Sequence, residues 1–215
     1  MNLRAEKARE QVARAGVRMA RAGLVIGSWG NVSYRIYHED LAVITPSGMP
    51  YDSLQPRDIA VIDLDGNIVE GERKPSTEYE LHTAIYRARP DIFAIMHTHS
   101  VFATAMAAAQ MPIPPAVEDL AQLLGGEVPV AKYAPAGSRE LAEAAVAALG
   151  RSNAVLLANH GMVGAGTTLD DAFNICQIVE KAAKVFLWAS LVGTPVVLSA
   201  REALALRQEY LTAYG

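Results

Sequence analysis

Residues 92–100 read Ile-Phe-Ala-Ile-Met-His-Thr-His-Ser, an apolar run that ends in two histidines one residue apart. The composition of the run is typical of a buried β-strand. Side chains alternate between the two faces of a strand, so His97 and His99 are predicted to project to the same side. Their Cα atoms would lie about 6.5–7 Å apart, which lets both imidazoles place a nitrogen about 2 Å from one zinc ion.

A second apolar run, residues 154–161, also leads to a histidine, His160. Three neutral imidazoles that leave one position open are typical of a catalytic zinc site rather than a structural one. A His-x-His pair by itself is more often a pair of surface or hydrogen-bonded histidines, and the third histidine favours the metal site. Position 101 is Val101, so the chain lacks the aspartate of a His-x-His-x-Asp hydrolase motif.

The composition is that of a globular protein, because 51% of the 215 residues are hydrophobic and 20% are charged. This length predicts one domain over residues 1–215 with a full core. The net charge of −4 argues against a nucleic-acid partner, and the lack of a run of about eighteen apolar residues argues against a membrane partner. The N-terminal residues contain no apolar signal-peptide core, and the single cysteine, Cys176, excludes an internal disulfide, so we expect a cytoplasmic protein.

Hydrophobic periodicity and turn residues predict a mixture of strands and helices. The expected strands cover residues 32–37, 41–45, 59–64, 68–69 and 128–132, together with the two runs that lead to His97 and His160. The expected helices cover residues 3–22, 77–89, 101–110, 118–124, 139–149, 169–191 and 199–213. Thr77 and Glu80 have the spacing of a capping box, and Ser138 is a predicted N-cap. Hairpins mixed with helices indicate a mixed or antiparallel sheet covered by helices.

Metal chemistry at a carbonyl group needs a base, and Glu78 is the candidate carboxylate. It lies in the first turn of the helix expected after Pro75, four residues before His82, so the two side chains share a face. The alternative is that Glu78 is an ordinary acidic residue of a first helical turn, where the helix dipole favours negative charge. His82 is a candidate to hold Glu78 or simply to pack in the core.

Three loops rich in glycine and small hydroxyl residues cover residues 27–31, 45–48 and 76–77. Glycine lets a ligand approach the backbone closely, and free N–H groups at helix starts bind anions. None of the loops matches a Walker or dinucleotide-binding motif. Each alone is most often a turn or a cap, but beside a metal site they are expected to hold one phosphate group together.

Five short motifs of the chain carry a resemblance to a known family. They are Gly30-Asn31-Val32-Ser33, Ile44-Thr45-Pro46-Ser47-Gly48, Pro75-Ser76-Thr77-Glu78, His97-Thr98-His99 and Asn159-His160-Gly161. The motifs occur in the order found in the zinc-dependent class II sugar-phosphate aldolase family, which the chain therefore resembles. That family groups L-fuculose-1-phosphate aldolase, L-rhamnulose-1-phosphate aldolase, L-ribulose-5-phosphate 4-epimerase and the adducin head domain. The expected helices before and after also fit, so the resemblance covers nearly the whole chain.

The resemblance implies a three-layer α/β fold with helices on both sides of the sheet, and a role for each motif. His97, His99 and His160 would bind Zn²⁺, although Co²⁺, Mn²⁺ and Fe²⁺ also suit three imidazoles. Glu78 would be the acid/base that moves the proton beside the substrate carbonyl. The residues that would line the phosphate site are Ser28, Gly30, Asn31, Thr45, Ser47, Gly48, Ser76 and Thr77.

The chain departs from the family where fuculose-phosphate aldolases carry a tyrosine from a neighbouring subunit, which protonates the aldehyde oxygen. Asp119 stands at that position, with Glu118 beside it, and epimerase and dehydratase relatives use a carboxylate in this region. Near the end of the chain, Tyr210 and Tyr214 resemble the tail that closes the site of the fuculose enzyme, and Tyr214 is the better match. Asp119 and Tyr214 are therefore catalytic candidates, while the role of Glu118 stays open.

The function implied by the resemblance is that of a metal-dependent aldolase. It would reversibly cleave a ketose 1-phosphate similar to L-fuculose 1-phosphate, giving dihydroxyacetone phosphate and an aldehyde. The family also implies a small phosphorylated sugar as substrate and a homotetramer with sites at subunit interfaces. The alternatives are an epimerase, dehydratase or decarboxylase on the same scaffold, and a non-catalytic adducin-like module. Epimerases tend to carry aspartate where Glu78 stands, and adducin heads lack the histidines, so both features favour the aldolase.

Overall fold

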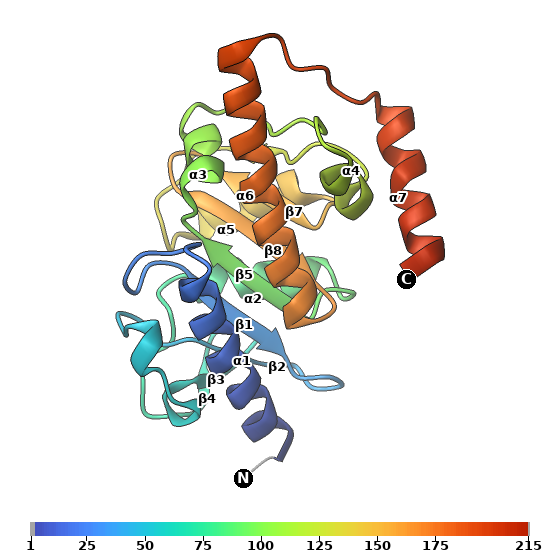
Figure 1. The fold of residues 1–215 in the computed structure, drawn as a ribbon. Helices are drawn as coiled ribbons and strands as arrows, with labels where there is room; N and C mark the ends of the chain where they lie inside the picture. Colours follow the sequence, from blue (N-terminus) through green and yellow to red (C-terminus); the bar gives the residue numbers. More distant parts are fainter. Residues whose placement is uncertain (1–2, 215) are drawn as a thin grey trace.

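The computed structural model of the protein describes the backbone of residues 3–214 and the side chains of residues 3–213. Within these residues one sheet of eight strands has the order β4-β3-β2-β1-β5-β8-β7-β6 (Figure 1). Neighbouring strands are antiparallel, except that β6 and β7 are parallel. The strands are β1 (Asn31–Arg35), β2 (Leu41–Ile44), β3 (Ala60–Asp63), β4 (Ile68–Glu70), β5 (Ala94–Thr98), β6 (Val130–Ala131), β7 (Ala154–Leu157) and β8 (Gly161–Gly166).

Helices cover both faces of this sheet and make three layers (Figure 1). The helices are α1 (Leu3–Arg21), α2 (Tyr79–Ala88), α3 (Val101–Ala108), α4 (Glu118–Leu124), α5 (Arg139–Leu149), α6 (Leu169–Val192) and α7 (Ala200–Tyr214), with the short 3₁₀ turns η1 (Tyr51–Ser53) and η2 (Pro56–Asp58). One hydrophobic cluster joins α1, α3, α4 and α6 to the sheet, and another joins α2 and α5 to the opposite face. The α/β fold with a mostly antiparallel mixed sheet between helices is therefore confirmed.

Strand β5 lies near the middle of the sheet, between β1 and β8, and its alternation sets the direction of the histidines. Ala94 and Met96 pack under the α1 and α6 layer, whereas Ile95 packs under α2 and α5. His97 follows Ile95 by two residues and so points to the α2 side. In the register it is paired with Asn31 of β1 on one side and with Val163 of β8 on the other.

Strand β8 is a strand that the sequence analysis did not predict. Its sequence is Gly-Met-Val-Gly-Ala-Gly, and glycine is a poor strand former. The glycines are required by packing, because a Cβ on Gly164 would lie 2.6 Å from Sγ of Cys176 in α6. His160 consequently lies in the tight turn between β7 and β8 rather than at the end of a strand, after Asn159 with φ of 58°.

The predicted capping box of Thr77 and Glu80 is wrong, because helix α2 begins at Tyr79. Glu78 occupies the N-cap position and its side chain does not cap the helix. The Glu78 N–H donates to Oγ of Ser76 at 3.2 Å, and the Tyr79 N–H donates to the carbonyl of Ser76 at 3.1 Å. This turn before the helix leaves the carboxylate of Glu78 pointing toward the histidines.

Other predicted elements are present with small changes of length. Ser138 caps α5 as predicted, with its Oγ accepting the N–H of Leu141 at 3.2 Å. Strand β6 is shorter than predicted, because Val128 forms only an isolated bridge with Ile113. Cys176 is buried in α6, in agreement with a packing role. Among residues 3–214 no helix has both the length and the apolar composition needed to cross a bilayer.

Candidate metal centre

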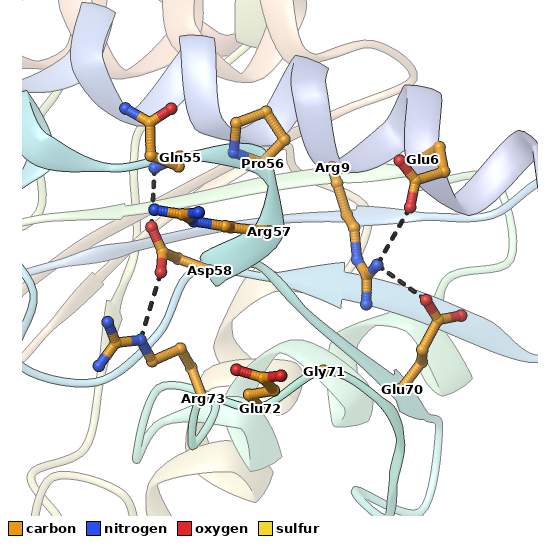
Figure 2. Close-up of a pocket in the computed structure, with 10 residues that line it drawn as sticks. All are labelled: Glu6, Arg9, Gln55, Pro56, Arg57, Asp58, Glu70, Gly71, Glu72 and Arg73. Carbon is orange, nitrogen blue, oxygen red and sulfur yellow. Dashed lines mark hydrogen bonds and ion pairs between the residues drawn. The ribbon is translucent and has the colours of Figure 1, made fainter. Parts of the chain in front are cut away.

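A cavity of about 1180 Å³ lies beside α1 (Figure 2). We call it the arginine pocket; its lining residues are Glu6, Arg9, Gln55, Pro56, Arg57, Asp58, Glu70, Gly71, Glu72 and Arg73. Arg9 donates to Glu70 at 2.9 Å and to Glu6 at 3.3 Å, and Arg73 donates to Asp58 at 3.2 Å. Guanidinium–carboxylate pairs of this kind hold segments together, and the lining includes neither an imidazole nor a thiol.

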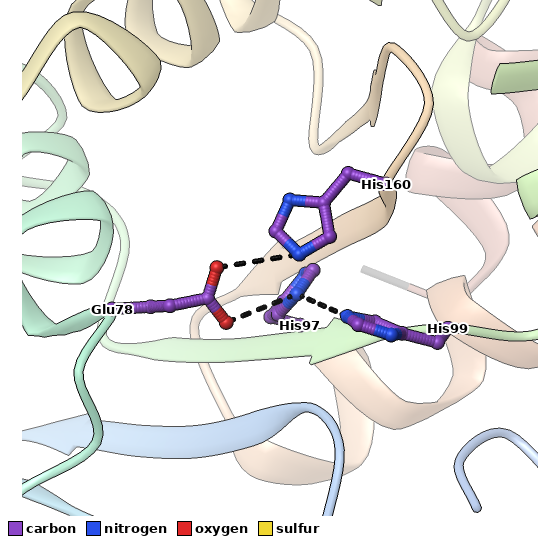
Figure 3. A group of neighbouring side chains, drawn as sticks. All are labelled: Glu78, His97, His99 and His160. Atoms are coloured by element: carbon purple, nitrogen blue, oxygen red, sulfur yellow. Dashed lines mark hydrogen bonds and ion pairs between the residues drawn. The ribbon is translucent and has the colours of Figure 1, made fainter. Parts of the chain in front are cut away.

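Among the residues that the structure describes, one cluster has the composition of a metal site, and it lies elsewhere. Glu78, His97, His99 and His160 each offer a ligand atom, and these atoms all lie within 4.8 Å of one another (Figure 3). Glu78 comes from the start of α2, His97 and His99 from the end of β5, and His160 from the turn between β7 and β8. The three segments meet because β5 and β8 are paired and α2 packs on the sheet beside them.

The hydrogen bonds of His97 show which of its nitrogens is free for a ligand. Its Nδ1 lies 2.9 Å from the carbonyl oxygen of Met162, which can only accept, so Nδ1 donates. In the neutral ring Nε2 then carries a lone pair. This atom lies 2.9 Å from Nε2 of His99 and 3.3 Å from Oε2 of Glu78. A backbone carbonyl that fixes the second nitrogen is the usual support of a metal-bound histidine.

Electron-rich atoms that face one another at these distances are stabilised by a hydrogen or a cation between them. His160 places Nε2 at 3.4 Å from Oε1 of Glu78, and this carboxylate oxygen is buried without a hydrogen-bond partner. One proton between His97 and Glu78 would satisfy only part of the cluster. A divalent cation would satisfy all four groups, because imidazole and carboxylate are its ordinary ligands. The residues therefore fit a metal ion.

Electrostatics keep His99, His160 and Glu78 in the ionisation states that bind metals. Burial and the neighbouring histidines lower the pKa of His99 to about 3 and that of His160 to about 4, so both rings are neutral at pH 7. Burial by itself would raise the pKa of Glu78, but His97 and His160 hold it well below its usual range. Burial opposes charge on His97 as well, but Glu78 raises the pKa of His97. Glu78 is thus a carboxylate, available as a ligand or as a base.

A pocket of about 310 Å³ opens above the cluster, and we call it the histidine pocket. Its lining residues are Ser28, Trp29, Gly30, Asn31, Pro46, Ser47, Gly48, Ser76, Thr77, Glu78, His99, Ala136 and His160. All three loops of the predicted phosphate site contribute to this lining. The structure therefore brings together segments that are far apart in the sequence, beside the candidate metal ligands.

Two glycines allow the loops to approach the histidine strand. Gly30 has φ of 89°, and a Cβ there would lie 2.6 Å from the carbonyl oxygen of His97. Gly161 follows His160, and a Cβ there would lie 2.4 Å from the carbonyl oxygen of Thr98. Real Cβ atoms do not come this close to a backbone oxygen, so both positions require glycine if the site is to keep its geometry.

Three predicted site residues with described side chains do not line the histidine pocket, namely Thr45, Asp119 and His97, and His97 is fully buried beneath it. Thr45 is buried behind the loop, where its Oγ1 accepts the N–H of Val32 at 3.1 Å. Asp119 lies in α4 and forms an ion pair with Lys181 of α6. Tyr214 is the last residue of α7, and its side chain lies outside the part of the chain that the structure describes.

No role was predicted for Trp29, although it lies within the predicted loop of residues 27–31. Its side chain is 67% exposed, and its ring centroid lies 5.9 Å from that of His99. The signal was an aromatic residue among the small residues of the loop, between Ser28 and Gly30. The side-chain amide of Asn31 also has an unexpected partner, because it donates to Oε2 of Glu78 at 2.9 Å. An amide group has a second N–H, which this contact with Glu78 does not use.

Comparisons with known proteins agree with this geometry. The family model for the Class II Aldolase and Adducin N-terminal domain matches residues 10–187. A 5-deoxy-D-ribulose 1-phosphate aldolase of Bacillus thuringiensis serovar kurstaki is 36% identical over 210 residues, covering 98% of either chain. A 5-methylthioribulose-1-phosphate/5-deoxyribulose-1-phosphate aldolase of Rhodospirillum rubrum is 37% identical over 193 residues, covering 90% of this chain and 86% of the relative. A solved L-fuculose 1-phosphate aldolase superposes with a TM-score of 0.93 at 38% identity, covering 95% of this chain and 96% of that one.

Proposed function

Because the chain belongs to the class II aldolase and adducin N-terminal family, we propose that it is a metal-dependent aldolase that reversibly cleaves a ketose 1-phosphate. The products are dihydroxyacetone phosphate and an aldehyde. The enzyme class, an aldehyde-lyase acting on phosphorylated sugars, is that of its relatives. The observation that supports the finer proposal most is the convergence of Glu78 and three imidazoles within 4.8 Å, beside loops suited to a phosphate group.

We propose that His97, His99 and His160 hold the metal ion, with Zn²⁺ as the native ion and Co²⁺, Mn²⁺ or Fe²⁺ as alternatives. A divalent cation there supplies a Lewis acid, which polarises the ketone and stabilises negative charge on the oxygens of the substrate. The carbonyl of Met162 supports this assignment by holding His97 in the tautomer that frees Nε2.

Glu78 holds and moves the proton of the reaction. When the carbon–carbon bond breaks, the three-carbon phosphate fragment leaves as an enediolate, which must take up a proton at carbon. Glu78 gives that proton in the cleavage direction and removes it in the synthetic direction. Its exposed fraction is only 7%, and this burial excludes water that would compete for the proton.

The phosphate group of the substrate is bound by the three loops that line the histidine pocket. Ser28, Ser47 and Thr77 offer hydroxyl groups, and Gly30 and Gly48 let the phosphate approach the backbone N–H groups. Ser76 lines the pocket as well, but its hydroxyl already accepts the N–H of Glu78. Thr45 supports the loop from behind. Binding the phosphate at a fixed distance from the metal ligands places the ketone beside Glu78.

We further propose that the chain assembles as a homotetramer with its sites at subunit interfaces. Large apolar side chains near the end of α6 and in the segment after it support such an assembly, for example Leu191 at 84% exposure and Val192 at 90%. In this arrangement Asp119 and Tyr214 would act on the aldehyde half of the substrate in a neighbouring site. Light scattering on the purified protein tests the assembly, and a monomer would contradict it.

We also propose one domain over residues 1–215 and a cytoplasmic location. The single sheet with a hydrophobic cluster on each face supports the domain proposal for the residues described. Limited proteolysis tests it, because separate domains would give stable fragments. Cell fractionation tests the location.

The experiment that tests the activity is a coupled assay for dihydroxyacetone phosphate. The substrates are L-fuculose 1-phosphate, L-rhamnulose 1-phosphate and 5-deoxyribulose 1-phosphate, each given to the metal-loaded enzyme. We expect triose phosphate from at least one of them, and the ratio of the kcat/KM values names the preferred sugar. If none releases triose phosphate, the cleavage reaction is not the function of this chain. Chelation followed by addition of single metals identifies the ion that restores activity.

A further inference from the structure

A row of hydrogen-bonded side chains leads from Glu78 into the core. Oε2 of Glu78 accepts from Nδ2 of Asn31 at 2.9 Å, and Oδ1 of Asn31 lies 2.5 Å from Nε2 of His82. Nδ1 of His82 lies 2.6 Å from Oγ of Ser33, and the same Oγ lies 2.6 Å from the hydroxyl of Tyr86. Each side chain in the row contacts the next one, and the first member is the proposed acid/base.

The row occupies the interface between β1 and α2. Asn31 and Ser33 are two residues apart in β1 and point to the same face, while His82 and Tyr86 are four residues apart on one side of α2. His82 and Ser33 are buried, with exposed fractions of 0% and 1%. Buried polar groups of this kind are strongly held by their partners, because water cannot replace a lost hydrogen bond.

The chemistry of the partners gives the hydrogen bonds a direction. A carboxylate can only accept, so the nitrogen of the Asn31 amide must face Glu78 and the oxygen must face His82. That oxygen accepts, so Nε2 of His82 must carry a hydrogen. In the neutral ring Nδ1 then accepts the hydroxyl hydrogen of Ser33. The Ser33 oxygen in turn accepts the hydroxyl hydrogen of Tyr86 at 2.6 Å, in preference to the longer contact of 3.2 Å between that hydroxyl and the carbonyl of Phe93. An Asn31 amide turned the other way would set its oxygen against the carboxylate and an N–H against the donor of His82.

The Asn31 N–H is important because the imidazoles cannot replace it when they bind a metal ion. His97 and His160 face Glu78 through their Nε2 atoms, and these atoms would then be directed at the ion. Oε1 of Glu78 has no hydrogen-bond partner among the residues described. The Asn31 amide is therefore the neutral donor that fixes the carboxylate of Glu78, and His82 is the group that fixes the amide.

We propose that His82 is a positioning residue, which holds Glu78 in its working orientation through the side-chain amide of Asn31 without touching the substrate. The proposal rests on the proposed function, in which Glu78 moves the proton. It predicts that loss of the His82 N–H slows proton transfer more than it weakens substrate binding. The ring has a second role in packing α2 on β1, so the test must separate the two.

A matched pair of variants separates them. His82→Gln places an amide N–H near the position of Nε2 and keeps a donor for Asn31. His82→Asn reaches only the position of Nδ1, so it keeps a partner for Ser33 and loses the donor for Asn31. Both variants replace a ring by an amide of intermediate size, which makes their packing losses comparable.

For His82→Asn we expect kcat to fall about 10- to 100-fold, as for other residues that orient a catalytic group. KM for the ketose phosphate and the amount of metal bound per chain should change less than about twofold, because His82 contacts neither the substrate nor the metal ion in this proposal. His82→Gln should recover most of the loss in kcat. Exchange of the carbon-bound proton of dihydroxyacetone phosphate with deuterated solvent, followed by NMR, should slow in parallel, since it isolates the step assigned to Glu78.

Equal losses in both variants, a rise in KM that matches the fall in kcat, or an unchanged kcat in His82→Asn would each overturn the proposal. Nitrogen NMR of the wild-type protein gives an answer that needs no variant to fold. We expect His82 as the neutral ring with hydrogen on Nε2, and hydrogen on Nδ1 instead would also overturn it. If the wild-type enzyme neither cleaves a ketose 1-phosphate nor exchanges the proton, the proposed function fails. The NMR measurement of the His82 tautomer would still test the hydrogen bonds between His82, Asn31 and Ser33.

Discussion

The arginine pocket has a volume of about 1180 Å³ and the histidine pocket about 310 Å³, yet the smaller one has the features of an active site. The charged groups of the arginine pocket include acids and bases that neutralise one another, as Arg9 does with Glu6 and Glu70 (Figure 2). In the histidine pocket, lone pairs and a carboxylate point at a common centre (Figure 3). Convergence of unsatisfied ligand atoms, rather than volume, identifies the site.

The strongest test of this comparison is His97→Ala. Loss of the central imidazole removes a ligand and leaves Glu78 facing an incomplete site. We expect bound metal to fall well below one per chain and kcat to fall by at least about 10³-fold, because the Lewis acid supplies several kcal/mol to the barrier. Metal analysis and the triose-phosphate assay check both results.

The control for this variant is His38→Ala, which removes an exposed histidine at the tip of the β1–β2 hairpin. It should leave metal content and kcat unchanged within about twofold, as is usual for surface substitutions. Full metal binding by His97→Ala would show that the cluster is not the metal site.

A loss of activity without a loss of metal is expected for Glu78→Gln, which keeps the shape of the side chain and removes its basicity. We expect kcat to fall about 10²- to 10⁴-fold, the usual contribution of an acid/base group. Metal should still bind through the three histidines. Steady-state kinetics and metal analysis of Glu78→Gln check the activity and the metal content. The control is Glu80→Gln, two residues further along in the first turn of α2. Retention of activity would assign the proton transfer to another group.

Gly161→Ala tests whether the histidine pocket depends on close backbone contact. The new Cβ would lie 2.4 Å from the carbonyl oxygen of Thr98 and 3.0 Å from Cδ2 of His99. We expect a loss of about 1–3 kcal/mol in the free energy of unfolding, the usual cost of overpacking, and a fall in kcat of about tenfold or more.

Denaturant unfolding and the coupled assay measure these two effects. The control is Gly126→Ala, since a Cβ at Gly126 would meet nothing within 4 Å. Equal behaviour of the two variants would mean that the turn carrying His160 can move away from β5 without harm.

The pH dependence of stability tests the buried row beside the site. Burial, together with the charge of His97, lowers the pKa of His82 to about 3, against about 6.5 in an unfolded chain. The unfolded state therefore binds the extra proton between about pH 6.5 and 3, and the free energy of unfolding falls as the pH falls through this range. His82 contributes up to about 1.4 kcal/mol per pH unit to that slope.

The measurement is denaturant unfolding of the metal-free protein at several pH values, with His82→Gln as the comparison. Glutamine does not titrate, so the variant should lose less stability on acidification than the wild type. Parallel curves for the two proteins would mean that His82 is not a buried neutral ring.

The smallest effect is expected in the arginine pocket, for Arg9→Met. Arg9 is buried, and its Nε and Nη2 have no hydrogen-bond partners among the described residues, whereas Glu6 and Glu70 are partly exposed and can be solvated. Replacement of such a charge by an apolar side chain is often close to neutral. We expect a change of at most about 1–2 kcal/mol in unfolding free energy and a kcat within about twofold of wild type. A large loss of kcat would make the arginine pocket part of the active site.

Much of the architecture was predictable from the sequence because it depends on local patterns. Apolar alternation and helix caps such as Ser138 predicted most elements within a few residues. The motif order from Gly30 to His160 identified the family, which the comparisons confirm. Strand β8 was not predicted, because glycine is a poor strand former and three of its six residues are glycines. Gly164 is needed for close packing against α6, and a local sequence pattern does not show such a contact.

The start of α2 shows the limit of a local rule. Thr77 and Glu80 have the spacing of a capping box, but Ser76 provides a turn that places Glu78 at the N-cap instead. Its carboxylate is then directed at His97 and His160, and their interaction decides the geometry. A contact between residues far apart in the sequence thus overrode the capping preference, which contributes only about 1 kcal/mol.

The sequence by itself determined the kinds of group available: imidazoles after apolar runs, a carboxylate at a helix start, and small residues in loops. Only the tertiary structure decided which of these groups meet. It placed His160 in a turn beside β5, engaged Asn31 with Glu78 and His82, and left Asp119 paired with Lys181. The physical reason is that strand pairing and helix packing set distances between remote segments, whereas a sequence pattern specifies only neighbours along the chain.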